Sequence, residues 1–146
     1  MILSLVAAIT KKGVLCFRIW RGILRSNDFS SFLLDVIDSL IRQGEDVNDY
    51  VFVIDQASQH YFTYASFMKN IIYYIYRPRK GCFLMPIENV FSIWKAHCKR
   101  MTHENEDMLV YNVFQASKFV TPQKCINCID HCFRFFEKCI YNEDFD

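Results

Sequence analysis

Two acidic residues, Asp55 and Glu88, stand where an α/β protein would place catalytic carboxylates. Asp55 follows the apolar run of residues 50–54, which predicts a strand, and ligands bind at the carboxyl ends of such strands. Glu88 follows Pro86, and a proline is typical of the first turn of a helix, where the helix dipole favours a carboxylate. Taken alone, Asp55 is more simply interpreted as a turn-capping residue and Glu88 as a glutamate that serves the dipole.

The cysteines near the C-terminus suggest a second kind of chemistry, a zinc site. Half of a zinc-ribbon pattern is formed by Cys125, Cys128, His131, Cys132 and Cys139. However, positions 125, 128, 132, 135 and 139 repeat at alternating intervals of three and four along a predicted helix, so the thiols and Phe135 share one apolar face. One straight helix cannot wrap four ligands tetrahedrally around an ion. We therefore favour a buried helical face, and metal analysis of the purified protein decides between the two.

The elements that must position these residues are predicted from the spacing of apolar side chains. Residues 2–9 and 14–20 are short apolar runs joined by a polar turn with Gly13, which predicts a β-hairpin. Between residues 29 and 41, apolar side chains recur at intervals of three and four, and polar residues that can cap a helix precede them. This pattern predicts an amphipathic helix that ends at Gly44. Further strands are predicted over residues 50–54 and 71–76, and further helices over residues 57–69, 87–101, 108–119 and 123–141.

This order of elements indicates an α/β fold with a mixed sheet and a helical C-terminal part. Within the predicted helix 87–101, the apolar face contains Ile87, Phe91, Trp94, Cys98 and Met101. The acid shares another face of that helix with polar and basic residues, namely Glu88, Ser92, Lys95 and Lys99.

Chain length, composition, net charge and the number of cysteines restrict the class of protein. A chain of 146 residues, 52% of them hydrophobic, is long enough for one compact domain and excludes a disordered chain. The net charge of +1 provides no global positive field, so DNA binding would need local patches. The odd number of cysteines, seven, and the expected lack of a secretory signal favour a reduced, intracellular protein. The longest apolar stretches are too short for a membrane span.

The residues around both acids resemble the motifs of mariner-like DDE transposases of the Tc/mariner superfamily. Residues 53–60 (Val-Ile-Asp-Gln-Ala-Ser-Gln-His) are similar to the motif in which a strand-ending aspartate precedes Asn-Ala-x-x-His. Residues 85–95 (Met-Pro-Ile-Glu-Asn-Val-Phe-Ser-Ile-Trp-Lys) resemble Asn-Pro-Ile-Glu-x-x-Trp-x-x-x-Lys. Residues 8–10, 13–14, 22 and 29–33 are similar to the family's second and third strands and the helix after them. The resemblance thus covers about residues 1–100 in the family's order.

The resemblance implies a ribonuclease-H-like mixed sheet flanked by helices. It implies a catalytic domain over residues 1–101 and a helical extension over residues 102–146 packed on the same domain. The implied activity is DNA transposition and integration, through phosphodiester cleavage and strand transfer with two Mg²⁺ or Mn²⁺ ions. Asp55 and Glu88 would be the second and third catalytic acids and metal ligands, whereas His60, Lys95 and Lys99 would meet DNA phosphates.

The implied partner is DNA, in the form of transposon ends, and the implied location is the nucleus. The resemblance also admits a homodimer, and it implies neither a small-molecule substrate nor a membrane.

The sequence departs from the family at its first catalytic aspartate, which would lie on a strand before the hairpin. The first acid in this chain is Asp28, which is predicted to lie at a helix cap. The expected sheet is therefore incomplete, with its first strand missing and two inner edges unpaired. In addition, Gln56 replaces the motif's Asn, and residues 82–85 replace Pro-Asp-Leu-Asn. We expect an incomplete, inactive transposase copy; the alternative is a non-catalytic remnant that binds nucleic acid or another protein.

Overall fold

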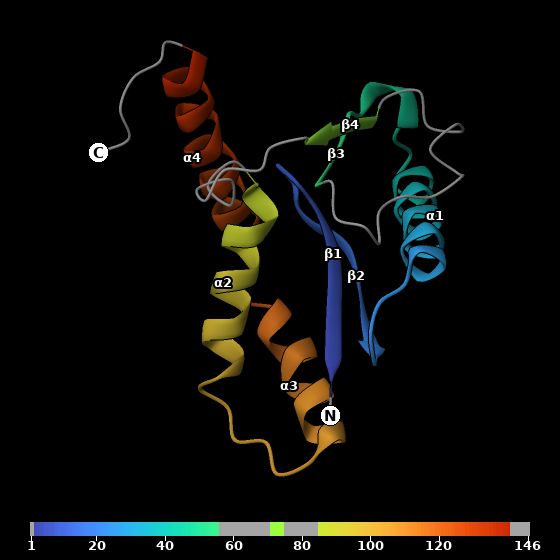
Figure 1. Cartoon of the computed structure of the whole chain (residues 1–146), viewed down its shortest axis with the longest axis vertical. Coiled ribbons are helices and arrows are strands. Elements are labelled where there is room, and N and C mark those ends of the chain that lie inside the picture. Colours follow the sequence, from blue (N-terminus) through green and yellow to red (C-terminus); the bar gives the residue numbers. More distant parts are fainter. Residues whose placement is uncertain (1, 56–70, 75–84, 141–146) are drawn as a thin grey trace. The chain divides into compact units, whose positions relative to one another are not determined.

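The computed structural model describes residues 2–55, 71–74 and 85–140 as a mixture of helices and strands (Figure 1). The elements in chain order are β1 (Leu3–Thr10), β2 (Gly13–Arg21), α1 (Ser26–Arg42), the 3-10 turn η1 (Val47–Asp49), β3 (Phe52–Asp55), β4 (Ile71–Tyr74), α2 (Pro86–Cys98), α3 (Glu106–Ser117) and α4 (Pro122–Ile140). The predicted α/β class is confirmed. The predicted helix over residues 57–69 lies outside the described residues.

The chain divides into two compact units. The N-terminal unit comprises residues 1–8 and 15–78, and the C-terminal unit comprises the hairpin tip, residues 9–14, together with residues 79–146. The domain boundary predicted after residue 101 stays a prediction.

The first two strands form the predicted hairpin. Gly13 adopts a φ of 119° after the turn, a conformation that favours glycine, and the Lys12 amide donates to the Thr10 hydroxyl at 3.0 Å. At the open end, the Gly22 amide donates to the Ile2 carbonyl at 2.8 Å, and the Ser4 hydroxyl donates to the Gly22 carbonyl at 2.8 Å. Hydrogen bonds therefore stabilise the hairpin both at its turn and at its open end.

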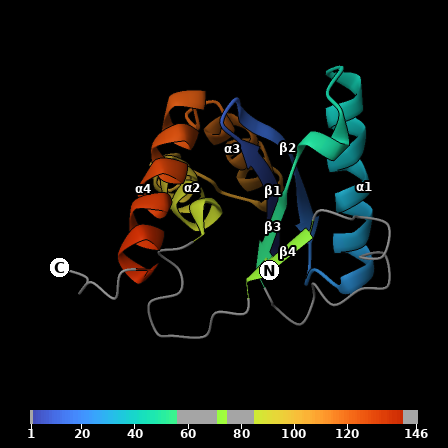
Figure 2. The same ribbon diagram turned by 90° about the horizontal axis from the view of Figure 1, so that it is seen from above.

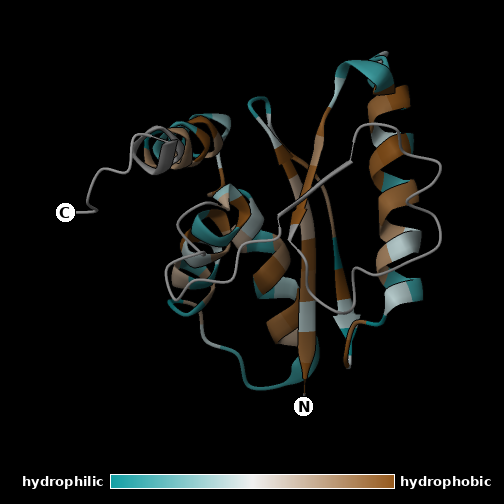
Figure 3. Ribbon diagram, turned by 45° about the horizontal axis from the view of Figure 1, so that its top comes forward, coloured by the Kyte–Doolittle hydropathy of each residue, from teal (hydrophilic) through white to brown (hydrophobic). Residues whose placement is uncertain are grey.

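Helix α1 supplies most of the core of the N-terminal unit. At its start the Arg25 amide donates to the Asp28 carboxylate at 2.9 Å, which satisfies one of the free donors of the first turn. It ends before Gly44, whose φ of 74° stops the helix as predicted. The core side chains of this unit are Val6, Phe29, Phe32, Leu33, Val36 and Ile54. Apolar residues of the hairpin and of α1 are visible as brown segments in Figure 3.

Strands β3 and β4 form a separate parallel pair, which Figure 2 shows from above. The register places Phe52 opposite Ile71 and Asp55 opposite Tyr74. Within the residues that the structure describes, each of the two sheets therefore has two strands, β1 with β2 and β3 with β4.

Three helices, α2 to α4, form the core of the C-terminal unit. The Trp94 indole Nε1 donates to the Val113 carbonyl at 2.8 Å, and this joins α2 to α3. Buried Asn112 donates from Nδ2 to the Thr102 carbonyl at 2.8 Å, which fixes the connection between the same two helices. Trp94 is 1% exposed and has the largest of the fully buried side chains among the described residues.

The buried face of α2 differs in part from the prediction. Trp94 and Cys98 are buried as expected, but Val90, absent from the predicted face, is completely buried. The other members of the predicted face, Ile87, Phe91 and Met101, are half-buried. Val90 lies three residues after Ile87 and four before Trp94, so helical geometry puts it on the same side. None of the described helices has the length and hydropathy that a membrane span requires.

Candidate functional site

Asp55 ends β3, as the sequence predicts. The preceding residue, Ile54, is 6% exposed and belongs to the core of the N-terminal unit, whereas Val53 is exposed. The parallel pairing with β4 places the carboxyl ends of both strands at one edge, the usual position of ligands in α/β sheets. The predicted place of Asp55 at the end of a strand is therefore confirmed, and its catalytic role stays a prediction.

Glu88 lies in the first turn of α2 and is exposed to solvent. Pro86 opens this helix, and the Glu88 amide donates to the Met85 carbonyl at 3.1 Å. The neighbouring Asn89 donates from Nδ2 to Cys132 Sγ at 3.6 Å, which ties the start of α2 to α4. Glu88 thus lies at the end of α2 where the helix dipole favours a negatively charged group.

The two acids belong to different units, Asp55 to the N-terminal unit and Glu88 to the C-terminal unit. Their expected meeting at one cation therefore stays a prediction. Within the described ranges, no three His, Cys, Asp or Glu side chains are arranged to hold a metal ion.

The predicted phosphate-binding lysines lie on the solvent side of α2. Lys95 and Lys99 are exposed, as are Glu88 and Ser92, so the predicted polar face of this helix is confirmed. The Lys99 amide donates to the Lys95 carbonyl at 2.9 Å, so the two side chains are one helical turn apart. The third predicted phosphate contact, His60, lies outside the described residues.

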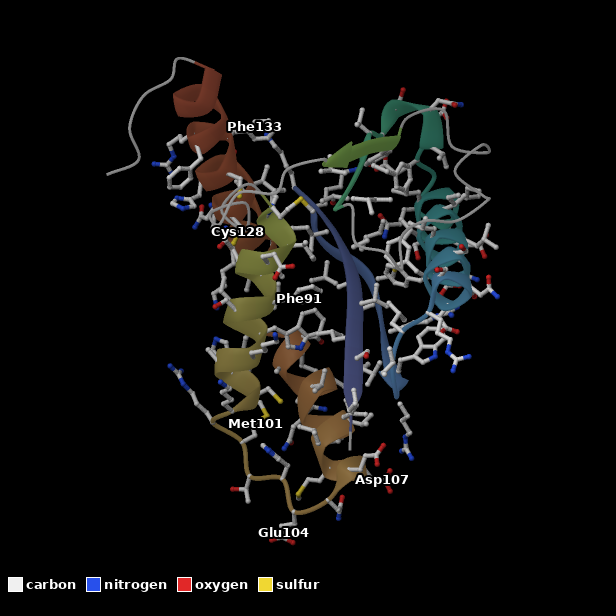
Figure 4. The ribbon with its side chains drawn as sticks, viewed as in Figure 1. Phe91, Met101, Glu104, Asp107, Cys128 and Phe133 are labelled. Atoms are coloured by element: carbon white, nitrogen blue, oxygen red, sulfur yellow. The ribbon has the colours of Figure 1, made fainter. Side chains whose placement is uncertain are left out.

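The C-terminal thiols are core groups in the described part of the chain. Cys125, Cys128 and Cys132 are all at most 8% exposed, which agrees with the predicted apolar face. Burial raises the pKa of all three thiols, and the pKa of Cys132 reaches about 11. Protonated thiols are poor nucleophiles and metal ligands. Figure 4 labels Cys128 on α4.

The other two residues of the suggested zinc pattern, His131 and Cys139, do not belong to the described group of buried thiols. His131 is exposed, and its ring contacts Phe135 edge-on at 4.7 Å between centroids. The side chain of Cys139 lies outside the described part of the chain.

The contact between His97 and Phe119 was not predicted from the sequence. The rings of His97, in the last turn of α2, and Phe119, just after α3, are stacked with centroids 4.3 Å apart and planes 5° apart. Burial lowers the pKa of His97, and the positive charges of Lys124 and Arg100 lower it further. No periodic pattern connects these residues, because the contact joins the end of one helix to a link between two others.

Comparisons with known proteins yield no family assignment. No protein-family model matches the chain, and no curated protein matches it significantly. Any functional assignment therefore depends on the residues and on their placement.

Proposed function

We propose that this chain is part of the catalytic domain of a mariner-like DDE transposase, which cuts and joins DNA in the nucleus. The observation that carries the proposal is the position of the two motif acids. Asp55 ends a strand in a parallel pair, and Glu88 is an exposed first-turn residue behind Pro86. Each acid thus occupies the kind of element end at which its motif requires a carboxylate.

A ribonuclease-H-like fold is the finer part of this proposal. The order hairpin, helix, parallel strand pair and helix agrees with that fold after its first strand. In a complete sheet of this type, the first strand lies beside the strand that ends in the second acid. Such a strand would pair with the inner edges of the two described two-stranded sheets.

The chemistry depends on carboxylates from separate elements. In the proposed site, Asp55 and Glu88 would hold Mg²⁺ or Mn²⁺, which would activate the attacking oxygen and stabilise the leaving one. Lys95 and Lys99 would orient the DNA by contacts with its phosphates. The sequence contains no acid before Asp28, so the family's first catalytic aspartate has no counterpart in the proposed alignment. We therefore propose that the 146-residue chain alone is inactive.

The second candidate is a non-catalytic remnant that binds either nucleic acid or an intact transposase. The exposed Lys95 and Lys99 favour this candidate, because phosphate contacts need no metal site.

A nicking assay on supercoiled plasmid tests the enzymatic proposal. The 146-residue chain is expected to be inactive with Mg²⁺ and with Mn²⁺. A version extended before Ile2 by an apolar strand that ends in Asp-Glu is expected to gain nicking. This gain should disappear in Asp55→Asn and in Glu88→Gln. The matched control is Asp107→Asn, which removes a first-turn acid from α3 instead of α2.

The results separate the two candidates. Nicking by the extended protein that survives Asp55→Asn and Glu88→Gln would contradict the assignment of the acids. Turnover by the unextended chain that is lost in Asp55→Ala would overturn the proposed inactivity and favour an active enzyme. DNA binding without nicking in every version would favour the remnant.

A further inference from the structure

Basic residues lie near a stacked ring pair in the C-terminal unit, where α2 ends and α3 leads into α4. The pair consists of His97 and exposed Phe119, whose parallel rings lie 4.3 Å apart. Arg100 follows α2, Lys118 directly precedes Phe119, and Lys124 lies in the first turn of α4. We call these five residues the ring patch.

Within the part of the chain that the structure describes, the hydrogen bonds of the two lysines involve no carboxylate. Lys124 Nζ donates to the Phe119 carbonyl at 2.8 Å, and Lys118 Nζ donates to Gln115 Oε1 at 2.8 Å. Both acceptors are neutral oxygens, so these contacts position the ammonium groups without neutralising them. A basic patch with these properties attracts a negatively charged ligand.

The acids of α3 lie at its far end from the ring patch. Glu106 and Asp107 are in the first turn, and Phe119 follows the last turn. A helix rises about 1.5 Å per residue, so the axial distance from Asp107 to Phe119 is on the order of 18 Å. Figure 4 shows Asp107 and Glu104 at the end of α3 that is joined to α2. At this distance, salt screens most of their effect on the patch.

His97 responds to the positive charges beside it. Burial lowers its pKa first, and repulsion by Lys124 from α4 and by Arg100 after α2 lowers it further. The imidazole is therefore neutral at neutral pH. A bound anion would reverse the repulsion and favour the protonated ring, because an opposite charge nearby stabilises the charged form.

We propose that the ring patch binds the phosphates of a single-stranded nucleic acid, and that His97 takes up a proton when the strand binds. The cations come from three segments of the chain, which suits several phosphates along a strand better than one small anion. Phe119 adds an exposed aromatic ring of the kind on which bases stack. The exposed Lys95 and Lys99 extend the positive surface along α2. This inference does not depend on the two acids.

The first test measures binding of a labelled single-stranded oligonucleotide to the whole chain by fluorescence anisotropy. The double variant Lys118→Gln/Lys124→Gln retains hydrogen-bond donors but loses two charges. Its affinity at low salt is expected to fall roughly tenfold or more. The slope of log affinity against log salt concentration should also become shallower, because about two fewer counterions are released on binding. The charge-loss control is Arg42→Gln, which changes an exposed residue of the N-terminal unit and should retain affinity.

The second test follows the histidine rings by NMR during a pH titration. Adding the oligonucleotide should raise the pKa of His97. By linkage, binding should then become several-fold tighter as the pH falls from 7.5 to 5.5. In the free protein, Lys124→Gln alone should raise the pKa of His97. Unfolding would raise it too, so the dispersion of the other NMR signals has to show that the variant is folded.

The outcomes are distinct. Equal affinity of the double variant and the wild type, or an unchanged His97 pKa with the oligonucleotide bound, would overturn the proposal. Equal effects of inorganic phosphate and of the oligonucleotide on His97 would also overturn it, since a site for one small anion would then suffice. Nicking and oligonucleotide binding are measured in separate assays on different variants, so a failure of the catalytic proposal remains distinguishable from a failure of this one.

Discussion

The two units of the chain build their cores from different side chains. The N-terminal unit buries aliphatic and phenyl groups against a hairpin and a helix, including Phe32 at 2% exposure. The C-terminal unit buries Trp94 together with thiols, including Cys125 and Cys132. The comparison teaches that a cysteine pattern resembling half of a zinc site can supply core volume instead, because a thiol behaves as a small apolar group when buried.

Charge also differs between the units. In the N-terminal unit, the Arg18 guanidinium forms an ion pair with Asp35 and donates to the Ser31 hydroxyl at 3.3 Å. In the ring patch, Lys118 and Lys124 donate to neutral oxygens instead. A cation paired with a carboxylate contributes to structure, whereas cations whose described hydrogen bonds go to neutral oxygens are better suited to bind an anion.

The largest expected effect comes from the core of the C-terminal unit. Trp94→Ala should lower the free energy of unfolding by about 3–5 kcal/mol, because it removes a buried ring and leaves a cavity. Phe32→Ala is the matched change in the N-terminal unit and should cost a similar amount. Amide hydrogen exchange should locate the first loss of protection in α2 to α4 and, for Phe32→Ala, in α1. Equal loss throughout the chain in both variants would contradict two separate cores.

A smaller effect is expected from the buried amide of the C-terminal unit. Asn112→Ala removes the donor to the Thr102 carbonyl and should cost about 1–3 kcal/mol in urea unfolding. The control is Asn127→Ala on α4, an exposed position where the change should stay within about 0.5 kcal/mol. Equal costs at both positions would show that the buried hydrogen bond does not stabilise the fold.

The thiols of the C-terminal unit predict a loss of stability in alkali. Folding raises the pKa of Cys132 from 9.0 to about 11, so above pH 9 the unfolded chain loses this proton before the folded one does. The stabilisation is complete below pH 9 and is lost as the pH rises toward 11. The stability difference between wild type and Cys132→Ala should therefore shrink, on the order of 1 kcal/mol, between pH 8 and 11. A constant difference would contradict a protonated, buried thiol.

The smallest effect is expected at the ion pair of the N-terminal unit. Asp35→Asn should cost roughly 0.2–1 kcal/mol at low salt, because both side chains are about one-third exposed. Added salt should reduce the difference. Asp38→Asn, on an exposed position of the same helix, is the control and should have less effect. A larger cost for Asp38 would show that helix charge, and not the pair, accounts for the result.

Much of the fold follows from local signals in the sequence. The hairpin turn at Gly13, the end of α1 at Gly44 and the start of α2 at Pro86 each depend on the backbone preference of one residue. The exposed face with Lys95 and Lys99 follows from helical periodicity alone. In these places the backbone preference of one residue, or the spacing of residues along one helix, is sufficient for the prediction.

The remainder of the structure depends on contacts between elements. Burial of Asn112 requires the Thr102 carbonyl, and the His97 stack requires Phe119 in the link after α3. Neither partner is marked by spacing in the sequence. Of the candidate site, the element ends that carry Asp55 and Glu88 were predictable, but their meeting depends on how distant segments assemble. The position of Val90 was predictable from periodicity and was nevertheless missed.

Binding of Mn²⁺ to the isotopically labelled chain, followed by NMR, tests the central claim most directly. If Asp55 and Glu88 share a cation, low concentrations of Mn²⁺ should broaden the amide signals of both residues together. Asp55→Asn should then abolish the broadening at Glu88 as well, whereas Asp107→Asn should leave both unchanged. Broadening at Glu88 that persists in Asp55→Asn would mean that the two acids bind cations separately, and the transposase assignment would have to be abandoned.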